Sequence, residues 1–255
     1  MLIVNLRYKK FIKYVGMAII GILVGMLAFW LGTIKIMNYM EGSVRVYNKF
    51  DLINIIFLTD EFSKFEYLSR SDISLFFLPF LFWGAGIMIA SSEFLLKPRS
   101  YITYVYSRVN KKSQAMRYIK GDSIMMTIVY VFSFVLTLCW CLDIFLPKGF
   151  EIMQRAQESM FFLHMGLHGI AAVLAVLVIG EIMFLFYCKR GVSFSFMGGI
   201  MMIVVLFLVD MQITGWNLIL FTPLYYFLDS ICSMLLCYLV MRKMNSLFGK
   251  IELSV

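Results

Sequence analysis

Six long apolar stretches divide this chain of 255 residues, and they restrict its fold more than any other feature. Each approaches the roughly 20 apolar residues that a helix needs to cross the hydrocarbon core of a bilayer. With 62% hydrophobic and only 15% charged residues, the chain could not cover a water-exposed surface with polar groups. The sequence therefore predicts an all-α integral membrane protein, a single transmembrane domain with helices at 16–37, 74–92, 122–146, 160–187, 195–210 and 224–241.

Basic residues are distributed unevenly between the segments that separate these spans. With both termini in the cytoplasm, 16 Lys and Arg residues lie on the inner side of the membrane and six on the outer side. Because basic loops are retained in the cytoplasm, this bias predicts a multi-pass protein of the cell membrane with both ends inside. The net charge of +8 is then explained by topology and anionic lipid, without a nucleic-acid partner. The first apolar run is too long for a signal peptide and should remain as an anchor.

Four of the segments outside these spans carry further predictions. Residues 1–15 alternate apolar and basic side chains at helical spacing, which predicts an amphipathic helix on the inner leaflet before the first span. The extracellular loop 38–73 contains an apolar patch and should form one or two short helices packed on the spans. The segment 211–223 contains Gly215 and Trp216 and should dip back into the outer leaflet. The fourth segment is the cytoplasmic loop 93–121.

The sequence lacks the common signatures of membrane enzymes. No GxxxxGK[ST] motif is present to bind nucleotide phosphates, and neither HExxH nor GxSxG occurs. We therefore expect no catalytic residues and no cofactor on this chain. Any energy source must come from another chain or from an ion gradient.

Two histidines, His164 and His168, lie one helical turn apart in the fourth span. The third span places Cys139 at similar depth, so a metal or haem site using these three side chains is geometrically possible. Polar packing near the membrane interface and contact with a substrate are the competing interpretations. Polar packing is the simplest of the three.

An intramembrane acid and a pair of glycines also allow two interpretations each. Glu181 lies in the inner half of the fourth span, where an unpaired carboxylate costs at least about 2.5–3.5 kcal/mol. It either lines a pathway or pairs with a neighbouring helix or with the basic residues of the loop 93–121. Gly21 and Gly25 form a GxxxG pattern that fits packing against a second membrane subunit or packing within the chain.

The cytoplasmic loop 93–121 is the most specific part of the sequence. It contains seven basic residues and begins with Glu93, where the second span ends. A helix beginning after Pro98 would place its tyrosines and an arginine on one face, by the spacing i, i+3, i+4 and i+7. That face could enter a groove on a cytosolic partner, and it consists of Tyr101, Tyr104, Val105 and Arg108.

This arrangement resembles the permease subunits of type-2 ABC exporters. In that family an elbow helix precedes six spans, and a Glu at the end of the second span is followed by Ser-Arg and then Lys in the first cytoplasmic loop. The matching positions here are Glu93, Ser107, Arg108 and then Lys111, Lys112 or Lys120. The chain departs from the pattern at 94–96, where Phe-Leu-Leu replaces a frequent Gly-Thr, and in its longer outer loop. These departures indicate a divergent branch, comparable to bacteriocin or peptide export and self-protection systems.

The resemblance implies a function and a set of partners. The chain would be the permease subunit of an ATP-driven exporter of an amphipathic substrate, paired with a second permease subunit. A separate cytosolic ATP-binding subunit would hold ATP and Mg and would dock on the loop 93–121 through Tyr101, Tyr104, Arg108, Lys111 and Lys112. Two alternatives remain open: a stand-alone immunity or sensor protein that binds a peptide through 38–73, and a metal or haem redox protein.

Overall fold

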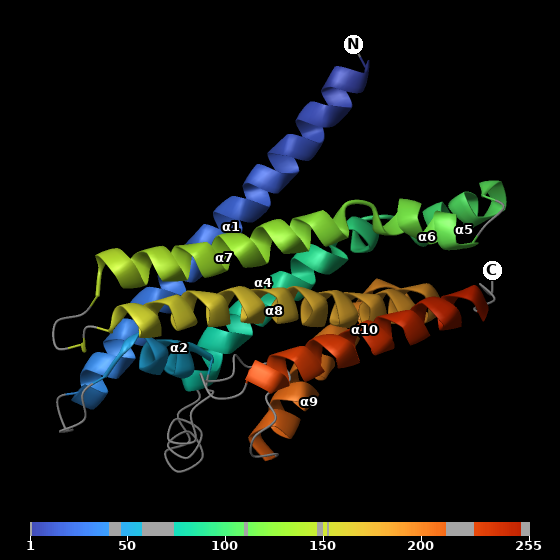
Figure 1. Ribbon diagram of the computed structural model, residues 1–255. Helices are drawn as coiled ribbons and strands as arrows, with labels where there is room; N and C mark the ends of the chain where they lie inside the picture. The colour runs from blue at the N-terminus through green and yellow to red at the C-terminus, as the bar shows by residue number, and fades with distance from the viewer. Residues whose placement is uncertain are drawn as a thin grey trace.

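The computed structural model describes residues 2–40, 47–57, 74–109, 112–146, 150–151, 153–212 and 227–250 (Figure 1). Every regular element within these ranges is a helix. Four helices are long and apolar enough to cross a membrane, with candidate spans Tyr8–Asn38, Phe77–Leu95, Ser123–Ile144 and Arg155–Arg190. The helices are α1 (Leu2–Met40), α2 (Lys49–Phe57), α4 (Ser74–Leu95), α5 (Arg99–Arg108), α6 (Lys112–Lys120), α7 (Ser123–Ile144), α8 (Arg155–Arg190), α9 (Val192–Gln212) and α10 (Phe227–Lys250).

The expected spans correspond to these helices in chain order. The first four lie in α1, α4, α7 and α8, which are the four candidate spans. The fifth lies in α9, whose apolar stretch Val192–Leu208 is shorter, and the sixth overlaps α10. Most of the segment 211–223, expected to dip into the membrane, lies outside the described residues.

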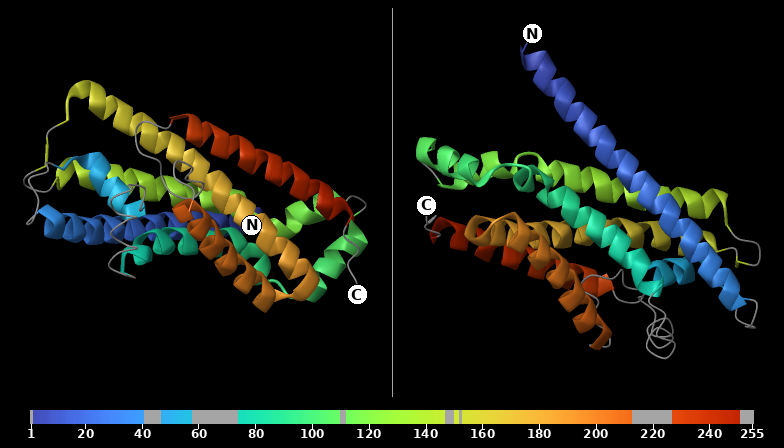
Figure 2. Two further views of the ribbon diagram at one scale, coloured as in Figure 1. Left: turned by 90° about the horizontal axis from the view of Figure 1, so that it is seen from below. Right: turned by 180° about the vertical axis from the view of Figure 1, so that it is seen from behind.

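The N-terminal segment differs from its prediction. α1 is one uninterrupted helix from Leu2 to Met40, so the helix expected at residues 1–15 continues directly into the first span and is not a separate element. The sequence around Gly16 contains no proline, and a single glycine costs a helix only about 1 kcal/mol. The N-terminal part of α1 extends away from the other helices (Figures 1 and 2), and its Tyr8, Phe11 and Ile12 side chains are exposed.

Small residues let the long helices approach closely. A Cβ atom on Gly21 of α1 would lie 2.5 Å from the backbone oxygen of Tyr130 in α7, and one on Gly25 would lie 3.0 Å from Thr137. The GxxxG pattern is therefore used for packing within the chain. Between α8 and α9 the chain reverses at Gly191, whose φ of 93° strongly favours glycine.

The middle of the bundle is an aromatic cluster contributed by three helices. The Phe82 ring of α4 lies 4.4 Å from that of Phe134 in α7 and 5.5 Å from that of Phe57 at the end of α2. The Tyr130 hydroxyl donates a hydrogen bond of 2.8 Å to the backbone oxygen of Phe82. The segment 38–73 was expected to form short helices packed on the spans, and within it α2 packs against α1 and α4 and reaches this cluster.

Charged side chains pair at the two ends of the bundle, which we call the hairpin end, where α5 and α6 lie, and the α2 end, where α2 begins. Asp122 precedes α7 and Asp143 lies in its last turn, whereas Glu158 lies in the first turn of α8 and Glu181 lies more than two turns before its end. Each pair is separated by about 21–23 residues, or roughly 33 Å of helix, close to the hydrocarbon thickness of a bilayer.

Candidate functional site

The loop 93–121 folds into a helical hairpin at one end of the molecule. α5 begins after Pro98, as predicted, and α6 returns the chain to the bundle (Figure 1). The two helices contact each other, and among their described side chains Ile102, Val105, Ala115 and Ile119 are buried. The hairpin lies beyond the ends of the long helices and beside the C-terminal end of α10, which α6 contacts.

The face predicted for partner binding is divided between two environments. Tyr104 is 50% exposed, and the guanidinium carbon of Arg108 lies 4.4 Å from the centre of its ring. Tyr101 is half-buried and Val105 is buried, so the four predicted side chains differ in how far they are open to a partner. The packing of α6 against α5 covers part of the predicted stripe. The exposed face of α5 consists of Ser100, Thr103, Tyr104, Ser107 and Arg108.

The structure describes only one of the two lysines, Lys111 and Lys112, that were predicted to contact a partner. Lys111 lies outside the described residues, and Lys112 is the first residue of α6. Between residues 94 and 121 the sequence contains seven basic and no acidic residues. A surface of one charge sign selects partners of the opposite sign.

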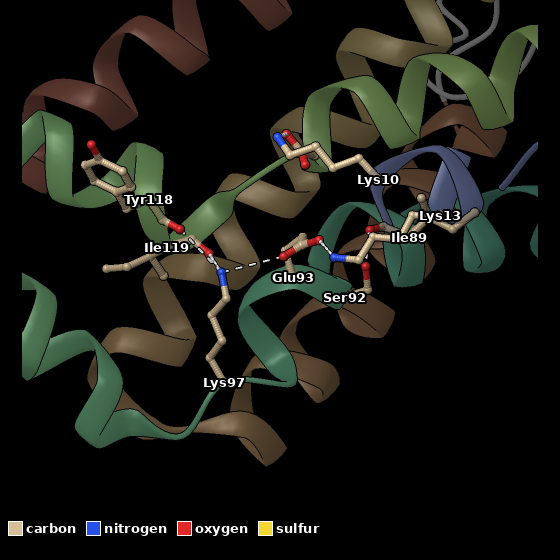
Figure 3. A network of polar contacts seen from close by, with 9 residues as sticks. Lys10, Lys13, Ile89, Ser92, Glu93, Lys97, Tyr118 and Ile119 are labelled. Atoms are coloured by element: carbon tan, nitrogen blue, oxygen red, sulfur yellow. Dashed lines mark hydrogen bonds and ion pairs between the residues drawn. The ribbon is translucent and has the colours of Figure 1, made fainter. Parts of the chain in front are cut away.

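Glu93, at the end of α4, is the centre of a polar network beneath the hairpin (Figure 3). Its carboxylate forms ion pairs with Lys13 of α1 at 2.5 Å and with Lys97 at 3.6 Å. A Cβ atom on Gly121, which links α6 to α7 with a φ of 57°, would lie 3.0 Å from the same carboxylate. Glu93 thus joins α1, α4 and the turn that carries α6 into α7.

Lys97 links the start of the hairpin to its end. Its ammonium donates to the backbone oxygens of Ile119 at 2.7 Å and Tyr118 at 3.3 Å, in the last turn of α6. Such carbonyls lack helical partners, so the lysine satisfies acceptors that would otherwise be free. Burial lowers the pKa of Lys97 below its ordinary value, although the charge of Glu93 opposes this shift.

A second set of contacts fastens the hairpin to α8. Glu181 forms an ion pair with Lys120, the last residue of α6, and both side chains are largely buried. The Tyr187 hydroxyl donates to the backbone oxygen of Lys97. Phe94 packs its ring 5.1 Å from that of Phe184. Of the two interpretations of Glu181, the contact with a basic residue of the loop is the one observed.

An exposed ion pair connects α1 to α7 at the same end. Lys10 lies 3.0 Å from Asp122, which precedes α7. Together with Lys13, Lys97 and Lys120, Lys10 gives the hairpin base four lysines paired with three carboxylates. The base is therefore tied to α1, α4, α7 and α8, so a force on the hairpin would reach four helices.

The two histidines lie in a different part of the molecule. Both are buried, their ring centres are 4.8 Å apart, and His168 Nδ1 lies 3.2 Å from the Ser230 hydroxyl of α10. Cys139 is half-buried on α7. Within the described ranges, no three His, Cys, Asp or Glu side chains are grouped closely enough to hold a metal ion. The contacts observed for the histidines are those of polar packing.

Sequence reasoning missed one charged group at the α2 end. The ammonium of Lys49, the first residue of α2, lies 2.6 Å from Asp143 Oδ1 and 3.4 Å from Glu158 Oε1. Its side chain is 6% exposed. From the sequence alone, Lys49 counts only as one of the six basic residues on the outer side. The apolar residues that follow Lys49 could have indicated this burial, because a helix that lacks a polar face is usually buried.

Comparisons with known proteins do not assign this arrangement to a family. No family model matches the chain. Neither the curated proteins nor the solved structures contain a match to it.

Proposed function

We propose that the chain is the permease subunit of an ATP-driven exporter in the cell membrane. In this proposal α1, α4, α7, α8, α9 and α10 are six spans, and the hairpin end with both chain termini is cytoplasmic. The bias of 16 basic residues against six supports this orientation. A separate cytosolic ATPase holds ATP and Mg, a second permease subunit completes the pathway, and the substrate is amphipathic.

The observation that carries the proposal is the construction of the hairpin. Its outward side presents the Tyr104–Arg108 pair, and its base is held by ion pairs and ring contacts to four long helices. A hairpin that served only as a loop would not need this anchorage. Closure of an ATPase against Tyr104 and Arg108 would push α5, and the contacts of Glu93, Lys97 and Lys120 would transmit the movement to the spans.

Charge reversal at Arg108 tests the docking step. Arg108→Glu is expected to reduce the recovery of a P-loop ATPase with the tagged, detergent-purified chain by at least about tenfold, equivalent to about 1.4 kcal/mol of binding. The measurement is quantitative mass spectrometry of the purified complex from the native cell. Tyr104→Ala should reduce substrate-linked ATP hydrolysis in the same preparation.

The matched control is Arg242→Glu, which makes the same charge change at an exposed position of α10 on the proposed cytoplasmic side. Both variants should reach the membrane in equal amounts. Equal ATPase recovery from all variants would contradict docking through α5. Purification of the wild-type chain without any ATPase would contradict the proposed function and favour a stand-alone membrane protein.

A further inference from the structure

The helix α2 spans only half of the bundle. Its first residue, Lys49, pairs with Asp143 in the last turn of α7 and with Glu158 in the first turn of α8. Its last residue, Phe57, packs against Phe134, which lies about halfway along α7. Nine helical residues cover about 13 Å, less than half of a bilayer core of about 30 Å. α2 therefore descends from the α2 end to the middle of the bundle and stops there.

Four long helices surround α2. Gly32 of α1 leaves room for it, because a Cβ atom there would lie 2.8 Å from Ile56 and 3.2 Å from Leu52. On the α8 side, the Phe50 ring lies 5.0 Å from that of Phe161. Phe57 reaches α4 and α7 through the aromatic cluster. Seven of the nine residues of α2 are buried, so it fills the space between these helices in this half of the bundle.

The first turn of α2 is capped by side chains of its own segment. The Asn48 side chain accepts hydrogen bonds from the backbone N–H groups of Phe50 at 2.9 Å and Asp51 at 3.1 Å. The Asp51 carboxylate accepts one from the Asn48 N–H at 2.8 Å, which completes a reciprocal cap. Because its own residues satisfy its first turn, α2 can leave its neighbours without unwinding at that end.

The contacts that hold the top of α2 are polar and partly open to water. The two carboxylates that bind Lys49 are 49% and 41% exposed, and they belong to different helices. The Glu151 N–H also donates a hydrogen bond of 2.9 Å to the Tyr47 backbone oxygen, just before α2. These bonds can exchange with water when α2 moves, whereas bonds buried among apolar side chains could not exchange at low cost.

We infer that α2 is the outer gate of the transport pathway, held closed by the ion pairs of Lys49 with Asp143 and Glu158. This inference rests on the proposed function and on its orientation, in which the α2 end faces outward. In the structure α2 blocks the outer half of the space between α1, α4, α7 and α8. Substrate leaves when α2 withdraws from this space and Lys49 exchanges its carboxylates for water.

Cysteine labelling tests whether α2 opens. In a variant without the five native cysteines, Leu52→Cys places a thiol at a position that is 0% exposed. A membrane-impermeant maleimide added outside intact cells should label it slowly. Adding Lys49→Met, which keeps the apolar stem and removes the charge, should raise the labelling rate about tenfold, as a shift of about 1.4 kcal/mol in the opening equilibrium would.

Two reference positions calibrate the labelling. Gln154→Cys, at an exposed site before α8, should react fast in both backgrounds, and Val176→Cys, buried in α8, should stay unreactive. A Leu52→Cys thiol that remains as unreactive as Val176→Cys after Lys49→Met would overturn the inference. Since this test needs neither ATP nor a partner, its result does not depend on whether an ATPase is found.

A reversible cross-link tests whether the opening is needed. Gly32→Cys with Ile56→Cys should form a disulfide in the cysteine-free background, because a Cβ atom on Gly32 would lie 2.8 Å from the Ile56 side chain. Oxidation should lower ATP turnover by the purified complex about fivefold, reductant should restore it, and the single variants should not respond. Full turnover by the cross-linked complex would overturn the gate while leaving the docking proposal intact.

Discussion

Gly21→Ala is expected to destabilise the protein severely, because the added methyl group would meet backbone and not a flexible side chain. The Cβ atom would lie 2.5 Å from the Tyr130 oxygen and 2.9 Å from Ser133 Cβ. α1 would have to move away from α7, and the close contact of Gly25 with Thr137 would open as well. A loss of about 3 kcal/mol, at the upper end of the usual cost of overpacking, or roughly 6–12 °C in the unfolding midpoint, is expected.

Gly16→Ala is the matched control on the same helix. No heavy atom lies within 4 Å of a Cβ atom at Gly16, so the change adds helix propensity and no clash. Thermal unfolding of the detergent-purified variants, followed by size-exclusion chromatography, should separate the two glycines clearly. If both variants unfold at the same temperature, the packing of α1 on α7 is not as described.

Breaking the Lys120–Glu181 pair is the second large effect that we expect. Glu181→Gln leaves the Lys120 ammonium without its carboxylate in a site where the two side chains are 17% and 19% exposed. Removing one member of a buried pair costs about 3–5 kcal/mol, and the partial exposure here favours the lower part of that range. The end of α6 would then detach from α8, and the hairpin would lose its ionic contact with that helix.

A double-mutant cycle checks this contact directly. Lys120→Met should destabilise the protein by a similar amount, and the double variant by less than the two single effects added together. Lys10→Met provides the control, because Lys10 forms its ion pair with Asp122 at a solvent-exposed position and should have no measurable effect. Additive effects of the two single substitutions would mean that Lys120 and Glu181 do not interact in the folded protein.

Hydropathy was sufficient to predict the helical class and the four long spans. A run such as Ser123–Ile144 has to be a helix in a bilayer, because only a helix satisfies every backbone group within the segment. The start of α5 after Pro98 could also be predicted from local sequence, because proline disfavours the helical conformation of the residue that precedes it. These features depend on short stretches of sequence and on the lipid solvent.

The side-chain burial and the ion pairs that the sequence did not predict depend on which helices pack against one another in the folded protein. Tyr101 and Tyr104 lie on one stripe of α5, but only the position of α6 decides that the first is half-buried and the second exposed. Lys13, which pairs with Glu93, and Lys120, which pairs with Glu181, lie 80 and 61 positions away from their partners along the chain. Spacing along one helix cannot identify such partners, although pairing with a basic residue of the loop was one of the two roles expected for Glu181.

The two levels of paired charges also determine how this protein can sit in different membranes. Lys49, Asp143 and Glu158 fix one edge of the apolar belt, and the network around Glu93 fixes the other. Because these side chains are already bonded to one another, they are less free to snorkel when the acyl chains are shorter or longer than the belt. Mismatch must then be absorbed by tilting of the whole bundle, and the acyl-chain length of the surrounding lipid becomes a determinant of the angle between the hairpin and the membrane plane.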